Sequence, residues 1–168
     1  MDEPRLRSDG LQLEEHRRFQ ERFWKIERIA WVAFAIVTVG ALLGLTGAGG
    51  PLATASAESS NAVISYPRVA RWETADELQI TFRSRDGVPE RMVTLSPGFA
   101  KTFQLEDVQP KPSETAISDR GQLLIFGNPA SNGGLVTMHI RAQSIGRNGF
   151  SITVDGDVST VLTTYVLP

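Results

Sequence analysis

The sequence contains no cysteine, and this absence restricts the chemistry open to the protein. Without thiolates there is no disulfide bond, zinc–thiolate site, iron–sulfur cluster or covalently attached c-type haem. Histidine is almost as scarce, with only His16 and His139 in the chain. The net charge of −2 is nearly balanced, so the composition gives no electrostatic indication of nucleic-acid binding.

Charged residues are also missing from a long internal stretch, residues 29–57. Its first part is rich in Leu, Ile, Val and Phe, each of which favours insertion into a bilayer by roughly 0.3–0.6 kcal/mol. We predict a transmembrane helix over residues 29–48, because about 20 helical residues cross a hydrocarbon core of ~30 Å. The span holds no ionisable residue and no histidine. It is therefore expected to anchor and pack, with no role in transport or in ligation of haem or chlorophyll.

Basic residues are concentrated before this stretch, and the next one after it is Arg68. The positive-inside rule then places the N-terminus in the cytoplasm and the C-terminal domain outside. The residues that carry the bias are Arg17, Arg18, Arg22, Lys25 and Arg28.

A cleaved signal peptide is the alternative interpretation of the apolar stretch. Ala55-Ser56-Ala57 matches the A-x-A pattern of a cleavage site. However, the preceding region would be 28 residues long with seven acidic residues, and the apolar stretch exceeds a usual signal-peptide core. We favour an uncleaved anchor.

Residues 1–28 are expected to form a cytoplasmic tail with an amphipathic helix, which starts near an N-cap at Asp9 and runs unbroken into the membrane. Glu21 and Lys25 are one of its i,i+4 pairs of opposite charge. Trp24, a further candidate partner-binding residue, lies seven residues before Trp31 and so on the same helix face, where both fit the inner interfacial belt. Other apolar residues on this helix form one stripe. The stripe is Phe19, Phe23, Ile26 and Ala30. It is either a docking surface for a larger membrane complex or a face that rests on lipid headgroups.

Within the predicted span, Gly40 and Gly44 continue to Ala48 in a small-xxx-small pattern. Such a ridge lets helix backbones approach closely, although Gly and Ala are also frequent in transmembrane helices by chance. We treat Gly40 and Gly44 as candidate partner-binding residues.

After a flexible linker predicted at residues 49–61, the period changes to two, and residues 62–168 predict a periplasmic β-domain. The alternation is clearest over residues 77–83 and 135–142. Asp155-Gly156 between two β-rich segments is a strong hairpin signal. Many short strands favour an antiparallel, immunoglobulin-like sandwich, without the cysteine pair of antibody domains.

Residues that could carry chemistry are few in this domain. His139 lies in mid-strand and is expected to face solvent, and Asp155 with Asp157 lacks the further carboxylates of a calcium loop. Phe99, in a loop predicted at residues 97–101, could meet a partner or fill the core. We predict no enzyme activity, no cofactor and no metal.

The layout resembles a largely uncharacterised group of small bacterial single-pass membrane proteins with an extracytoplasmic immunoglobulin-like β-sandwich. Two segments carry the resemblance: residues 15–24, Glu-His-Arg-Arg-Phe-Gln-Glu-Arg-Phe-Trp, and residues 165–168, Tyr-Val-Leu-Pro. The layout is also similar to accessory subunits of photosynthetic or respiratory complexes. The resemblance implies architecture and bacterial origin, and no reaction.

Our leading hypothesis is a non-catalytic accessory subunit of a bacterial inner-membrane complex, with a photosynthetic reaction-centre assembly as first choice and a respiratory oxidase as second. Its partners would be the other subunits and the lipid bilayer. One alternative is a membrane-tethered module that binds a periplasmic ligand or protein, which requires a concave site with converging polar groups. A membrane-anchored enzyme is a third, and it would need a cluster around His139 or the acidic loops.

Overall fold

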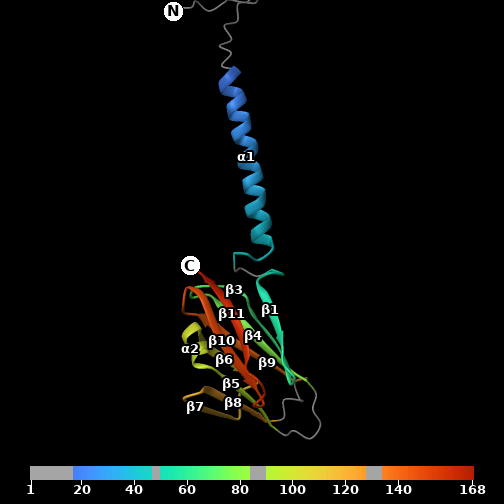
Figure 1. Cartoon of the computed structure of the whole chain (residues 1–168), viewed down its shortest axis with the longest axis vertical. Helices are drawn as coiled ribbons and strands as arrows, with labels where there is room; N and C mark the ends of the chain where they lie inside the picture. The colour runs from blue at the N-terminus through green and yellow to red at the C-terminus, as the bar shows by residue number, and fades with distance from the viewer. Residues whose placement is uncertain (1–16, 47–49, 84–89, 128–133) are drawn as a thin grey trace, which may run out of the picture. The chain divides into compact units, whose positions relative to one another are not determined.

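The computed structural model describes residues 17–46, 50–83, 90–127 and 134–168 (Figure 1). The chain divides into two compact units, Met1–Val39 and Gly40–Pro168. Several residues named above lie outside the described residues: the predicted N-cap Asp9, His16 and Ala48.

The first unit holds most of helix α1, Arg17–Leu42, which is 26 residues long. It contains no proline and no glycine before Gly40, so nothing in the sequence interrupts the i→i−4 hydrogen bonds. Its one hydroxyl in the apolar half, Thr38 Oγ1, donates to the carbonyl of Phe34 at 2.9 Å. The helix is continuous from the basic segment into the apolar segment, as predicted.

The helix ends six residues before the predicted end, at Leu42 instead of Ala48. Gly44 N–H donates to the carbonyl of Ala41 at 3.0 Å, and Leu45 N–H donates to that of Gly40 at 3.1 Å. These bonds and the positive φ of 92° at Gly44 form a Schellman cap, which a glycine adopts without steric cost. Among the described residues, no helix combines the length and the apolar character needed to cross a membrane.

The second unit is a sandwich of two β-sheets, which confirms the coarse fold prediction. One sheet has the order β1-β2-β4-β9-β6. Its strands are β1 (Thr54–Glu58), β2 (Ala62–Pro67), β4 (Ala75–Phe82), β9 (Leu135–Ala142) and β6 (Phe103–Gln109). The other has the order β3-β11-β10-β5-β8-β7. Its strands are β3 (Val69–Arg71), β11 (Thr160–Leu167), β10 (Gly146–Val154), β5 (Glu90–Leu95), β8 (Gly121–Gly127) and β7 (Glu114–Ser118).

Alternating residues of both sheets fill the core between them. In the first sheet Leu78 pairs with Met138, and Ile80 pairs with Val136, all four fully buried. All pairings of neighbouring strands are antiparallel within the described residues except that of β3 with β11. The period of two in the sequence thus becomes one inward and one outward face per strand.

Three elements were not predicted. β1 lies inside the predicted flexible linker and pairs with β2, and β7 pairs with β8 at a sheet edge. The short helix α2, Pro97–Thr102, takes the place of the predicted loop. Ser96 is its N-cap: Ser96 Oγ accepts hydrogen bonds from the backbone N–H of Phe99 at 3.4 Å and of Ser151 at 3.0 Å. The linker prediction is therefore wrong for residues 54–58.

The hairpin predicted at Asp155-Gly156 is confirmed. β10 and β11 pair antiparallel with Ile152 opposite Thr160. The φ angles of 52° at Asp155 and 69° at Gly156 are those of a type I′ turn, which Asp-Gly favours.

Candidate functional site

The apolar stripe of α1 is exposed along its described length. Phe19, Phe23 and Ile26 are between 58% and 68% exposed, and Ala30 is exposed as well. The rings of Phe19 and Phe23 stack with centroids 6.3 Å apart, so they present one continuous apolar surface. Trp24 is similarly exposed, at 65%, but it projects away from this stripe, about 100° around the helix from Phe23.

Beyond the stripe, α1 is apolar on all sides from Ile29 to Leu42. Every large apolar side chain of this segment is between 55% and 74% exposed. These side chains are Ile29, Trp31, Val32, Phe34, Ile36, Val37, Val39 and Leu42. A helix that is hydrophobic all round is stable where protein or lipid surrounds it. Exposure of so many apolar side chains to water is unfavourable.

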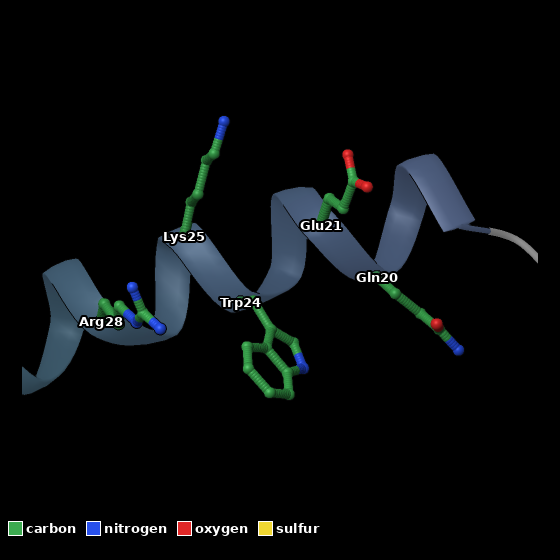
Figure 2. A pocket seen from close by; sticks show the side chains of 5 residues that line it. All are labelled: Gln20, Glu21, Trp24, Lys25 and Arg28. Atoms are coloured by element: carbon green, nitrogen blue, oxygen red, sulfur yellow. The ribbon is translucent and has the colours of Figure 1, made fainter.

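A hollow of about 450 Å³ lies on the N-terminal half of α1, on the side that carries the charges (Figure 2). Glu21 and Lys25 extend to one side, and Gln20 and Trp24 to the other, with Arg28 completing the lining. The structure records no ion pair between Glu21 and Lys25, so their predicted i,i+4 contact is absent between these two described side chains. One helix forms the whole lining, so the hollow is a groove between neighbouring side chains.

The two glycines proposed for helix packing lie in different environments. Gly40 is in α1, and a side chain there would meet Leu45 Cδ1 at 3.6 Å. Gly44 is the capping residue beyond the helix end and is buried. It does not extend a helical ridge from Gly40, because the helix has already ended at Leu42.

Phe99 is a core residue and is 2% exposed. Its ring packs against those of Phe103 and Phe150, with centroids 5.6 Å and 5.7 Å away. The prediction that Phe99 contacts a partner is therefore wrong, and the alternative that it fills the core is confirmed. Its place in α2, whose cap fixes the backbone, turns the ring inward.

His139 lies on the outer face of the first sheet and is partly exposed, as expected. It is directly opposite Glu77 and Asp107 on the two neighbouring strands, with Nδ1 3.8 Å from Glu77 Oε1. The side-chain amide of Gln109 donates to Asp107 and is the main cause that lowers the pKa of this carboxyl. Among the described residues, no group of three or more metal-binding side chains converges.

One buried charge cluster escaped the sequence analysis. Arg91 is 4% exposed and donates to the carbonyls of Arg83 and Asn61, both at 3.0 Å. Its guanidinium carbon lies 4.5 Å from the ring centre of Phe82, and Nε lies 2.7 Å from Asp155 Oδ2. The last contact is an ion pair without a well-directed hydrogen bond, because neither atom has a hydrogen-bond partner.

The alternation of β5 could have predicted this cluster. Arg91 is two residues before Val93 and four before Leu95, which both face inward, so Arg91 must lie on the same face of the strand. Asp155 also accepts a hydrogen bond from the N–H of Met92 at 2.9 Å. Both of its oxygens therefore contact groups of the sandwich itself.

The outer face of the second sheet carries a polar hollow of about 460 Å³. Thr94 and Thr153 are direct neighbours across β5 and β10, and the hydroxyls of Thr153 and Ser159 are hydrogen-bonded at 2.7 Å. Arg120 supplies the one charged side chain of the lining. The complete lining is Thr94, Ser96, Arg120, Ser151, Thr153, Gly156 and Ser159.

No family model matches the chain, and no curated protein matches it. Among solved structures, the chain is similar to the crystal structure of domains 4 and 5 of the S-layer protein SbsC, with 11% identity and a TM-score of 0.40. The match covers 68% of this chain, and the chain spans about half, 54%, of that structure.

Proposed function

We propose that the protein is a non-catalytic accessory subunit of a bacterial inner-membrane complex, anchored by α1 and carrying the β-sandwich outside the cytoplasm. One observation carries the proposal: the large apolar side chains of α1 are exposed, whereas most of those in the sandwich strands fill a core. A surface of this kind needs lipid or other chains around it.

The apolar segment of the helix is too short to cross the hydrocarbon core by itself, so the flanking residues must extend the apolar length. The uncharged helical residues Ile29–Leu42 rise about 21 Å, less than the ~30 Å of a hydrocarbon core. Lys25 and Arg28, just before this segment, have apolar stems that let their charged ends reach the headgroup region while their backbone lies in the hydrocarbon core. Leu43 and Leu45, which are exposed beyond the helix end, add apolar surface on the other side.

The basic bias before Ile29 supports an N-terminus in the cytoplasm. The immunoglobulin-like subclass of the sandwich, the choice of a photosynthetic assembly over a respiratory oxidase, and the lack of enzyme activity stay predictions.

Extraction in mild detergent, followed by native size analysis and identification of co-purifying chains, tests the proposal. The protein is expected to migrate with other membrane subunits. Replacing Phe19 and Phe23 by Ser should release those subunits, whereas Glu21→Ser with Lys25→Ser, on the charged side, should retain them. A free monomer without co-purifying chains would contradict the proposal.

A tethered binding module is the second candidate, and the polar hollow on the second sheet favours it. Arg120 and the surrounding hydroxyls fit an oxyanion or an anionic sugar better than an apolar ligand. NMR titration with glucuronate and with inorganic phosphate would test this, with shifts expected at Thr94 and Thr153 and lost in Arg120→Ala. Unchanged spectra at millimolar ligand would reject it.

A further inference from the structure

The stripe of α1 continues as a heptad pattern through the uncharged half of the helix. The spacing alternates between four and three residues over seven positions, all apolar or glycine. These positions are Phe19, Phe23, Ile26, Ala30, Ala33, Val37 and Gly40. A repeat of 3.5 residues is the signature of two helices that wind around each other with a left-handed twist.

The charged half of the helix shows which of its residues belong to this repeat, because few of them are apolar. Between residues 17 and 28 the apolar positions are Phe19, Phe23, Trp24 and Ile26, and Trp24 is the one outside the repeat. In the uncharged half the repeat includes Ala30 and Ala33, whose small side chains let a second helix backbone approach. The stripe therefore has large apolar side chains in the charged half and mostly small ones in the uncharged half, where two helix backbones can come close.

Two charged residues flank the stripe at complementary positions. In heptad terms Arg22 is a g position and Glu27 is the following e position. Neither has an oppositely charged residue three or four positions away in its own helix, where ion pairs form. In a parallel pair of helices, a g residue lies beside the e residue five positions later in the partner. Arg22 would thus meet Glu27 of the other helix, twice by symmetry.

We infer that the occupant of the stripe is a second copy of this chain, packed parallel and in register along α1. The inference rests on the proposed function, in which α1 binds a helix partner, and names that partner. A parallel arrangement also follows if both copies cross the membrane in the same direction. An antiparallel pair would bring g positions together and leave Arg22 without Glu27.

The opposite side of α1 stays available in such a pair. Trp24, Lys25 and Arg28, which line the groove in Figure 2, occupy b, c and f positions, away from the stripe. Pairing of two copies therefore leaves this side to lipid, and the other subunits would bind the assembled pair, so that loss of the stripe releases them as well.

Cysteine cross-linking tests the inference directly, because the natural chain has no cysteine and each variant carries a single thiol. Phe23→Cys, Ile26→Cys and Ala33→Cys lie on the stripe, and Lys25→Cys and Val32→Cys lie off it. Oxidation of the full-length protein in membranes should give a disulfide-linked homodimer about fivefold more at stripe positions than off it, with a 3.5-residue period. Equal cross-linking at all positions, or cross-links at the stripe to a different chain, would overturn the inference.

Charge reversal gives an independent readout of the parallel register. Arg22→Glu and Glu27→Arg, each in the Ile26→Cys background, should lower the homodimer yield several-fold, and the double reversal should restore it. Glu21→Arg, at an f position, is the matched control and should not change the yield. If the homodimer yield of the double variant stays low while the unfolding midpoint of its sandwich is unchanged, the Arg22–Glu27 contact is excluded.

The two proposals fail in different ways. Absent homodimer cross-links in a protein that still co-purifies with other subunits would remove the second copy and keep the accessory role. Periodic homodimer cross-links without other subunits would keep the pair and remove the accessory role.

Discussion

The β-sandwich and helix α1 both have regular apolar periodicity, but only one of them buries it. In the sandwich, Leu78 and Ile80 recur every second residue and are fully buried. In α1, Phe23 and Ile26 recur at helical spacing and are more than half exposed. A sheet can cover its apolar face with a second sheet of the same chain, whereas a lone helix needs an apolar environment from elsewhere.

The two regions also differ in how they place their charged side chains. The sandwich buries Arg91 and offsets the desolvation with two carbonyls, a carboxylate and an aromatic ring. In α1, Arg22 and Glu27 are exposed, and neither has an opposite charge at ion-pairing distance along its own helix. The sandwich therefore pairs its buried charge within its own fold, whereas Arg22 and Glu27 are exposed without such a partner in their own helix.

Breaking the buried ion pair should give the largest effect in the sandwich. Asp155→Ala leaves Arg91 charged and buried, and also removes the acceptor for Met92 N–H. We expect a loss of about 3–5 kcal/mol in the free energy of unfolding, measured by denaturant titration. Asp157→Ala, in the same turn, is the matched control. A loss of less than about 1 kcal/mol for Asp155→Ala would mean that solvent reaches Arg91.

Truncating the same type of residue in each region sharpens the comparison. Phe99→Ala should lower the free energy of unfolding by about 3–5 kcal/mol, because it leaves a cavity beside Phe103 and Phe150. Phe23→Ala should leave the unfolding of the sandwich unchanged, because its side chain is exposed. Unchanged stability in Phe99→Ala, measured by the same titration, would contradict its place in the core.

The helix cap of α2 should have a smaller effect. Ser96→Ala removes the acceptor for Phe99 N–H and Ser151 N–H, with an expected loss of about 1 kcal/mol. Ser96→Thr keeps an acceptor and should retain most of the stability. Equal losses in the two variants would show that steric fit, and not the hydrogen bonds, matters at this position.

Acid unfolding should show the smallest effects. Hydrogen bonds lower the pKa of Asp107 and of Asp157 from 3.8, led by the Gln109 amide for Asp107 and the Val158 N–H for Asp157. A carboxyl with a lowered folded-state pKa stabilises the fold above its unfolded-state pKa, and this stability is lost as the pH falls through the folded-state value. Asp107→Asn and Asp157→Asn should therefore make the loss of stability below pH ~4 shallower.

Asp76 should give a pH dependence of stability with the opposite sign, because burial raises the pKa of its carboxyl. Its contribution is present below the unfolded-state pKa and is lost as the pH rises through the folded-state value. Asp76→Asn should therefore gain relative stability near neutral pH, measured as the unfolding midpoint across the pH range. A parallel shift of all three variants would contradict these signs.

The parts of the fold that the sequence predicted well are those with clear alternation. β9 was predicted with the bounds Leu135–Ala142 that the structure has, because its inward-facing residues, Val136, Met138, Ile140 and Ala142, are all apolar and regularly spaced. β1, Thr54–Glu58, has only small and polar residues, and all of β7, Glu114–Ser118, is exposed. Such strands are held by backbone pairing with a neighbour, which leaves no apolar pattern in the sequence.

The candidate site was predicted in part, for similar reasons. The stripe residues Phe19, Phe23 and Ile26 follow from helical periodicity and lie on one exposed helix. The capping role of Gly44 depends on a backbone conformation with positive φ, and the same glycine also fits a helix-packing pattern. Phe99 could not be assigned from its flanks, because its burial depends on strands distant in sequence.

Vesicle flotation of the full-length chain tests most directly whether α1 is an anchor. The protein is predicted to float with phospholipid vesicles and to resist extraction at high pH. Ile36→Lys adds a charge to the apolar half at a cost of about 2.5–3.5 kcal/mol, so it should move the protein toward the aqueous fraction with the unfolding midpoint of the sandwich unchanged. A natural chain that stays in the aqueous fraction as a folded monomer would contradict the account.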